Sequence, residues 1–102
     1  MFGMYEVNKL DHILSLKDKL KELKMNKEES MQSYIMRVSQ LRDQLQNFGA
    51  TISDRVLVMI TLQGLPPILE IFITTISNNY RLPKFDDLVG KCTQEETKMI
   101  AQ

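Results

Sequence analysis

The fold of this chain is decided by residues 23–76, which read LKMNKEESMQSYIMRVSQLRDQLQNFGATISDRVLVMITLQGLPPILEIFITTI. In the first half of this stretch, apolar residues recur three, four and seven positions apart, which is the period of a helix with one buried face. These residues are Met31, Tyr34, Ile35, Val38, Leu41, Leu45 and Phe48. Ser30 or Asn26 is placed to cap the start, and Gly49 suits a left-handed residue at the end. The pattern predicts a helix from about residue 30 to residue 48.

The second half of the stretch predicts two shorter helices. Ser53 suits the cap of the first, and Gly64 with the two following prolines ends it. Pro67 suits the first position of the next helix, which should end at the polar residues 77–79. Its expected buried side consists of Ile68, Ile71, Phe72, Thr75 and Ile76. The β-branched run 71–76 also suits a strand, but the chain offers no second convincing strand to pair with it.

Two further helices flank this stretch. Residues 6–24 carry apolar side chains at heptad-like spacing, and residues from about 85 onward carry a second apolar face. The first set is Ile13, Leu16, Leu20 and Leu23, and the second is Phe85, Leu88, Val89, Cys92 and Met99. We therefore expect an all-α chain, a compact bundle of about five helices. We expect one domain over residues 1–102, with a leading helix at 1–24 and a four-helix core at 26–100.

The composition excludes several classes of protein. Thirteen basic and thirteen acidic residues cancel, which disfavours an electrostatic nucleic-acid binder. The basic run Lys17–Lys27 is interleaved with acidic residues, as on a solvated helix face, so direct nucleic-acid binding is the weakest hypothesis. No apolar run reaches the roughly 18 residues of a membrane span, and no signal peptide is recognisable. The single cysteine fits a reducing compartment, so we expect a cytoplasmic protein without a membrane partner.

No residue pattern predicts catalysis, a metal site, a cofactor or a small-molecule substrate. Cys92 and His12 are the one conceivable nucleophile and base, but Cys92 falls on an apolar helix face, as a structural thiol does. Paired acids such as Glu95 and Glu96 are neighbours on a helix and therefore point in different directions. Seven methionines could form an adaptable binding groove, although gap-filling in a helical core is their commoner use.

The sharpest polar pattern is formed by Glu29, Tyr34 and Arg37. This spacing allows a carboxylate in the segment before the helix to reach a guanidinium in the helix's second turn. A bidentate pair would hold that segment against the helix. Unrelated surface charges are the alternative explanation of the same spacing.

Taken in order, several short motifs resemble the Gag polypeptide of copia-type LTR retrotransposons. They are Leu23-Lys24-Met25, Glu29 to Tyr34, Leu45 to Gly49, Ile52-Ser53-Asp54, Gln63 to Pro67, Phe72 to Ile76 and the closing Gln94-Glu95-Glu96. The resemblance covers about residues 5–98. It implies a likeness to the C-terminal domain of retroviral capsids, in which Glu29, Tyr34 and Arg37 would belong to a buried hydrogen-bond network. It also implies a non-enzymatic protein that self-associates into a shell around element RNA, with RNA held by other Gag regions.

Two surfaces are candidates for that self-association, with a dimer as the expected basic unit. Val58, Met59 and Leu62 are left over if Val56, Leu57 and Ile60 fill the core, so they form the first candidate. The rival is the heptad-like set Ile13, Leu16, Leu20 and Leu23. A Gag-derived adaptor that binds peptides of other proteins in a helical groove is the alternative function.

Overall fold

The structure is a computed structural model and describes residues 4–78 and 81–101. In chain order the elements are α1 (Met4–Glu22), α2 (Met31–Asn47), α3 (Asp54–Gln63), a short 3₁₀ turn η1 (Pro67–Leu69), α4 (Glu70–Ser77) and α5 (Phe85–Ala101). Every regular element within these ranges is helical, which confirms the all-α prediction. The ends lie within about two residues of the predicted ones, because caps and prolines mark them.

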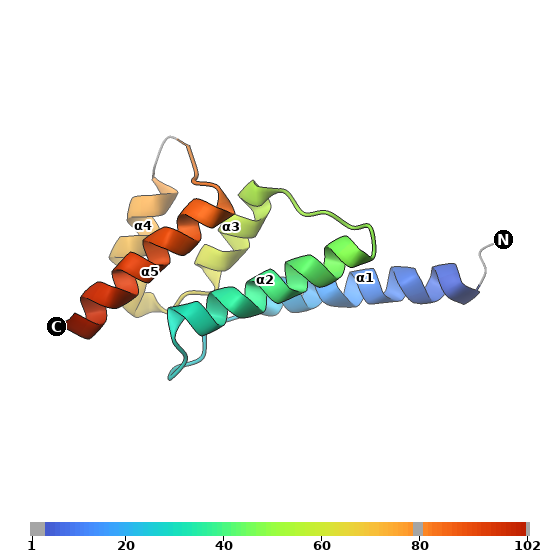
Figure 1. The fold of residues 1–102 in the computed structure, drawn as a ribbon, viewed down its shortest axis with the longest axis horizontal. Coiled ribbons are helices and arrows are strands. Elements are labelled where there is room, and N and C mark those ends of the chain that lie inside the picture. The colour runs from blue at the N-terminus through green and yellow to red at the C-terminus, as the bar shows by residue number, and fades with distance from the viewer. Residues whose placement is uncertain (1–3, 79–80, 102) are drawn as a thin grey trace.

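Helices α1 and α2 lie side by side and run in opposite directions, and α3, α4 and α5 gather toward the end of the molecule where α2 begins (Figure 1). The first turns of α1 extend beyond the end of α2 (Figure 1). The molecule is consequently elongated, with a longest dimension of 58 Å. Its radius of gyration is 15.5 Å, against the roughly 13 Å expected for a compact domain of this length.

The helix ends follow local rules of capping. The Ser30 hydroxyl accepts a hydrogen bond from the backbone N–H of Ser33 at 3.1 Å, and Ser53 does the same for Val56 at 3.3 Å. Gly49, just beyond α2, has a φ of 80°, the left-handed conformation that glycine adopts without strain. These three residues were the predicted caps, and the structure confirms their roles.

The core lies where α2 packs against α1 and α5, and where α5 packs against α3. Its fully buried side chains come from α2, α3 and α5 and include Tyr34, Val38, Leu45, Leu57 and Leu88. Helix α1 joins this core through Leu20, which is 1% exposed. The predicted face of α2 is therefore buried as expected.

The predicted faces of α3 and α4 were correct in part: Leu57 and Ile76 are buried, and Ile60 and Phe72 pack against the core, but other members are exposed. Val56 is 46% exposed, whereas Val58 is fully buried. Because α3 is apolar on several sides, its period does not determine which side faces the core. On the next element Ile68 and Ile71 are 81% and 83% exposed, whereas Leu69 is buried. The 3₁₀ turn η1 has three residues per turn instead of 3.6, so it shifts the buried side away from the one that an α-helical register predicts.

Within the described residues, no single helix has the length and composition needed to cross a membrane. Asp54–Gln63 and Pro67–Ser77 meet that criterion only as a pair, bent by 117°.

Candidate functional site

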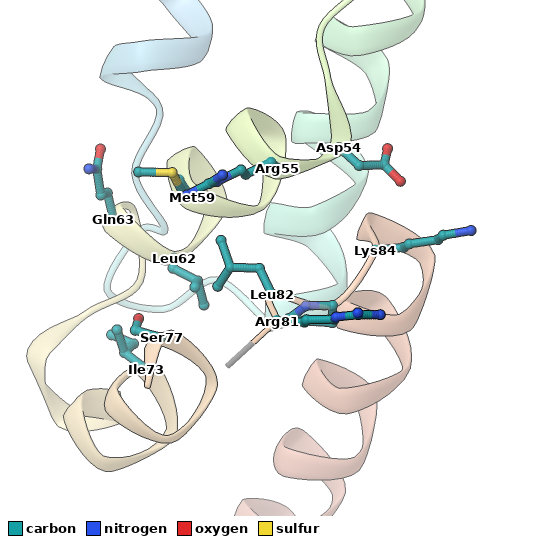
Figure 2. Close-up of a pocket in the computed structure, with 11 residues that line it drawn as sticks. Asp54, Arg55, Met59, Leu62, Gln63, Ile73, Ser77, Arg81, Leu82 and Lys84 are labelled. Carbon is teal, nitrogen blue, oxygen red and sulfur yellow. The ribbon is translucent and has the colours of Figure 1, made fainter. Parts of the chain in front are cut away.

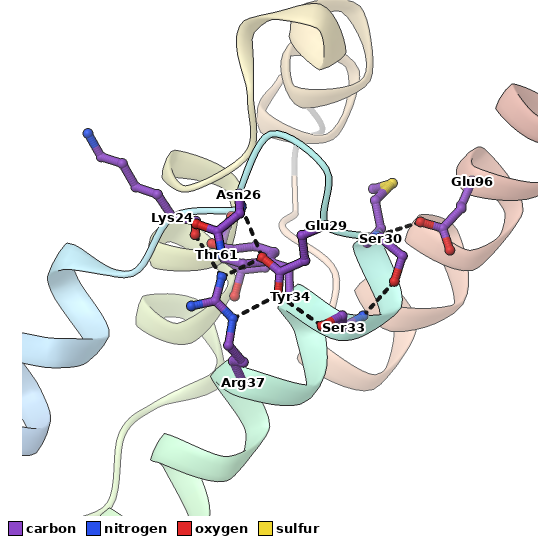
Figure 3. Close-up of polar contacts among 10 residues, drawn as sticks. Lys24, Asn26, Glu29, Ser30, Ser33, Tyr34, Arg37, Thr61 and Glu96 are labelled. Atoms are coloured by element: carbon purple, nitrogen blue, oxygen red, sulfur yellow. Dashed lines mark hydrogen bonds and ion pairs between the residues drawn. The ribbon is translucent and has the colours of Figure 1, made fainter.

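The segment between α1 and α2 is fixed to α2 by an ion pair between Glu29 and Arg37. The Arg37 Nε and Nη2 atoms donate to Glu29 Oε2 and Oε1 at 2.8 and 2.5 Å, so the pair is bidentate (Figure 3). Arg37 Nη2 also donates to the carbonyl oxygen of Lys24 at 2.8 Å. One guanidinium thus ties together the end of the α1 segment, the turn before α2 and the second turn of α2.

Glu29 accepts further hydrogen bonds and is held in its ionised form. The backbone N–H of Asn26 donates to Oε1 at 3.0 Å, and the Ser33 hydroxyl donates to Oε2 at 2.9 Å (Figure 3). The Glu29 side chain is only 8% exposed. Its bond with Arg37 lowers the carboxyl pKa from 4.5 to about 2, although burial acts in the opposite direction. The carboxylate is therefore a permanent acceptor at neutral pH.

Tyr34 does not join this ion pair, although the sequence grouped it with Glu29 and Arg37. Its side chain is fully buried, and its hydroxyl donates to the carbonyl oxygen of Thr61 at 2.9 Å. The Arg37 guanidinium lies 5.9 Å from the centre of the Tyr34 ring. Tyr34 therefore links α2 to α3, whereas Glu29 and Arg37 hold the segment between α1 and α2 against α2.

Gly64 is needed at the end of α3 because other groups approach it closely. A Cβ atom at this position would lie 2.0 Å from the Tyr34 hydroxyl oxygen and 2.6 Å from the Leu23 carbonyl oxygen. The Gly64 carbonyl oxygen accepts a hydrogen bond from the backbone N–H of Met25 at 2.9 Å. Its φ of −85° is open to any residue, so close approach and not a left-handed turn explains the glycine. We call Leu23, Met25, Tyr34 and Gly64 the Gly64 junction.

Helix α5 completes the polar framework with a contact that the sequence did not reveal. A carboxylate oxygen of Glu96 accepts a hydrogen bond from the backbone N–H of Met31 at the start of α2 (Figure 3). Helix α2 has no acidic residue in its own first turn, so Glu96 supplies the negative charge that a helix N-terminus favours. The partners are 65 residues apart, and no local spacing points to them.

Cys92 and His12, the one conceivable nucleophile and base, have different surroundings. Cys92 is buried, and burial, followed by the nearby carboxylates of Glu96 and Glu95, raises its pKa to about 11. Such a thiol is a poor nucleophile at neutral pH. His12 is exposed on α1, and the centre of its ring lies 5.3 Å from the centre of the Phe48 ring, just beyond α2. Among the residues searched, which are those the structure describes, no three His, Cys, Asp or Glu side chains are grouped to hold a metal ion.

The packing assumed for the predicted dimer surface was wrong in two of its three residues. Val58 is fully buried and Leu62 is 5% exposed, because both face the core of their own chain. Met59 is 45% exposed and remains available. In the rival set, Leu20 is buried, and Ile13, Leu16 and Leu23 pack against the same core. The heptad-like face of α1 therefore meets α2 of its own chain.

A cleft of about 720 Å³ opens between α3, α4 and the segment that leads into α5; we call it the α3–α4 cleft. Leu62 and Leu82 lie at its centre, and Arg81 and Lys84 lie on the side of α5 (Figure 2). The complete lining is Asp54, Arg55, Met59, Leu62, Gln63, Ile73, Ser77, Arg81, Leu82, Pro83 and Lys84. The cleft thus combines an apolar floor with three cationic side chains and one carboxylate at its edges.

A comparison with protein families finds a match to the model of the gag-polypeptide of LTR copia-type over residues 2–101. Comparisons with curated proteins and with solved structures gave no match. The family match spans the Gly64 junction, the Glu29–Arg37 pair and the α3–α4 cleft.

Proposed function

The chain belongs to the Gag polypeptides of copia-type LTR retrotransposons, and we propose that it is the part of Gag whose copies associate into a capsid-like shell. A dimer is the basic unit of this association. The shell encloses element RNA, which other regions of Gag contact directly. The proposed place of assembly is the cytoplasm.

One observation carries this proposal: α3, η1 and α4 expose large apolar side chains in a stretch of the chain with almost no charge. Glu70 is the one charged residue in positions 56–78. Val56, Met59, Ile68 and Ile71 are nevertheless 45% exposed or more. Surfaces that become the core of an interface are depleted of charge in this way. Covering exposed apolar groups with a partner lowers the free energy, because the apolar area is removed from water.

The Glu29–Arg37 pair adds support from a second direction. The resemblance to retroviral capsid domains implied a hydrogen-bond network at Glu29, Tyr34 and Arg37, and two of these residues, Glu29 and Arg37, form a bidentate pair. It fixes the turn before α2 without lying on the exposed apolar surface. Its role in the proposed function is therefore to keep the fold of each copy rigid while other residues make the contacts between copies.

Size-exclusion chromatography with light scattering over a concentration series tests the proposal. We expect a mass of at least twice the 11.9 kDa chain that falls on dilution. Met59→Asp should reduce the association without loss of helicity, because Met59 is exposed. Gln44→Asp, an equally charged change at an exposed position of α2, should leave the association unchanged. A wild-type chain that stays monomeric up to millimolar concentration would contradict the proposal.

The α3–α4 cleft favours a second candidate function, that of a Gag-derived adaptor. Its volume lies within the range of ligand sites, and its apolar floor suits a peptide side chain. An adaptor of this kind binds a peptide of another protein and remains monomeric by itself. The chromatography experiment therefore separates the two candidates.

A further inference from the structure

The structure carries a more specific inference about which surfaces meet when copies associate. We propose that the α3–α4 cleft of one copy receives residues 68–71 of a second copy, which we call the isoleucine turn. The inference rests on the proposed self-association and adds the two surfaces involved. It is argued below from the charge and apolar character of each surface.

The cleft offers positive charge without internal partners. Arg55, Arg81 and Lys84 line it, and within the described part of the chain no carboxylate oxygen lies within 4.0 Å of their side-chain nitrogens. With the single acid Asp54, the lining carries a formal charge of plus two, whereas the whole chain is neutral. The floor between these groups is apolar, from Met59 and Leu82 among others. The occupant that fits has apolar side chains beside a carboxylate.

The isoleucine turn has this character. Ile68 and Ile71 have the highest exposure among the exposed large apolar residues, at 81% and 83%. Glu70 lies between them, is exposed, and is the one charged residue between Arg55 and Arg81. Two isoleucines would cover the apolar floor while the Glu70 carboxylate meets the cations at the edge. The charge and apolar pattern of each surface therefore complements that of the other.

The isoleucine turn and the α3–α4 cleft both include residues of α4 but face different directions. Ile73 and Ser77 of α4 line the cleft of their own chain. At about 100° per residue, Ile71 lies roughly 200° from Ile73 around the helix, and so points away from that cleft. The turn cannot enter the cleft of its own copy. The contact therefore joins two different surfaces of neighbouring copies. In a two-fold dimer it is made twice, with the turn of each copy in the cleft of the other, and without that symmetry it continues from copy to copy.

A small contact of this kind should be weak. Two isoleucines and one carboxylate bury far less than the roughly 800 Å² per partner of a standard stable interface. Association should therefore appear at high concentration and strengthen where several copies meet, as in a shell.

Two variants separate the two surfaces. The turn variant carries Ile68→Ser and Ile71→Ser, and the cleft variant carries Arg81→Glu and Lys84→Glu. All four positions are exposed, so both variants should keep the helicity and thermal stability of the wild type. Lys91→Glu with Lys98→Glu is a control with the same change of charge at exposed positions of α5. Sedimentation velocity is measured at concentrations where the wild type associates.

Each variant alone should be monomeric, with association at least tenfold weaker than that of the wild type and of the α5 control. The equimolar mixture of the two variants should form a dimer and nothing larger. In the mixture one productive contact remains, between the intact turn of the cleft variant and the intact cleft of the turn variant. This outcome distinguishes a turn-to-cleft contact from one in which the same surface of both copies meets, where two defective copies would not restore each other.

Three results would overturn the inference: wild-type association by either variant alone, a dimer formed by one variant alone, or a mixture that stays monomeric. In each of these cases the wild type still associates, so the proposed Gag function survives. A wild type that remains monomeric would instead refute the proposed function and this contact together.

Discussion

Replacing Gly64 by alanine should destabilise the chain by about 2 kcal/mol, although the same replacement at Gly90 should stabilise it. The added methyl at residue 64 would meet the Tyr34 hydroxyl oxygen at 2.0 Å and the Leu23 carbonyl oxygen at 2.6 Å. Tyr34 is fully buried with its hydroxyl bonded, and the carbonyl belongs to the backbone, so neither group moves without cost. Nothing lies within 4 Å of a Cβ atom at Gly90.

The expected change in the free energy of unfolding follows from two opposing effects. Overpacking of a filled core costs about 1–3 kcal/mol, and a contact with backbone belongs at the upper end. The lower backbone entropy of the unfolded alanine chain offsets about 0.4–1 kcal/mol at either glycine. The net loss of about 2 kcal/mol for Gly64→Ala corresponds to a melting temperature lower by about 8–16 °C. Gly90→Ala lacks the clash, so it should gain about 0.5–1 kcal/mol.

Tyr34→Phe tests whether contact with the Tyr34 hydroxyl group causes the loss of stability in Gly64→Ala. Alone it removes the hydrogen bond to Thr61, at a cost of about 1 kcal/mol. Combined with Gly64→Ala it also removes the 2.0 Å contact, so the double variant should be about 1 kcal/mol more stable than additivity predicts. Urea denaturation followed by circular dichroism, at one fixed protein concentration, measures all four variants. Additive effects, or equal stability of Gly64→Ala and Gly90→Ala, would refute the packing argument.

Three further predictions concern the polar framework and the thiol. Glu29→Gln should lower the free energy of unfolding by about 2 kcal/mol at pH 7, a value reduced from the full pKa shift because Arg37 is partly exposed. The pKa of Glu29 is lower in the folded chain than in the unfolded chain, so this stabilisation is complete above pH 4.5 and disappears as the pH falls toward 2. The free energy of unfolding of the Glu29→Gln variant should therefore lack this pH-dependent loss. Glu96→Gln should lower the free energy of unfolding by about 1 kcal/mol, because it removes the negative charge at the start of α2. Glu95→Gln should leave the free energy of unfolding, measured by urea denaturation, unchanged. Cys92 should react with a thiol reagent at pH 8 only after unfolding in urea, and rapid labelling of the native chain would show that its burial is not maintained.

The helix positions were predictable from the sequence because they depend on neighbouring residues. Ser30, Ser53 and Gly49 act within one turn of their own helix ends, and Pro67 acts at its own position. The Glu29–Arg37 contact was predictable for the same reason, since both residues belong to one turn and the helix that follows it. Such information is contained in spacing alone.

Contacts between distant segments were not predictable in this way. Nothing in the sequence indicated a structural partner for Glu96, because the group it contacts is the backbone N–H of Met31 in a distant segment. Gly64 looked like a helix stop, although its position against Tyr34 and Leu23 explains the glycine better. In both cases the role of the residue depends on a group that the fold brings near it. The residue's neighbours in the sequence give no information about that group.

The assignments of apolar helix faces to the surface or to the core failed for a different physical reason. Periodicity shows that a helix has an apolar face but not whether its own chain or a second copy covers that face. The α1 face at Leu20 and the α3 face at Val58 are both covered by their own chain. Ile68 and Ile71 were assigned to the core, yet they are the most exposed large apolar residues in the part of the chain that the structure describes. The 3₁₀ turn that begins at Pro67, directly after Pro66, places Leu69 inside and leaves Ile68 and Ile71 outside. The two prolines therefore act on the surface as well as on the fold, because the geometry that they impose leaves two isoleucines exposed.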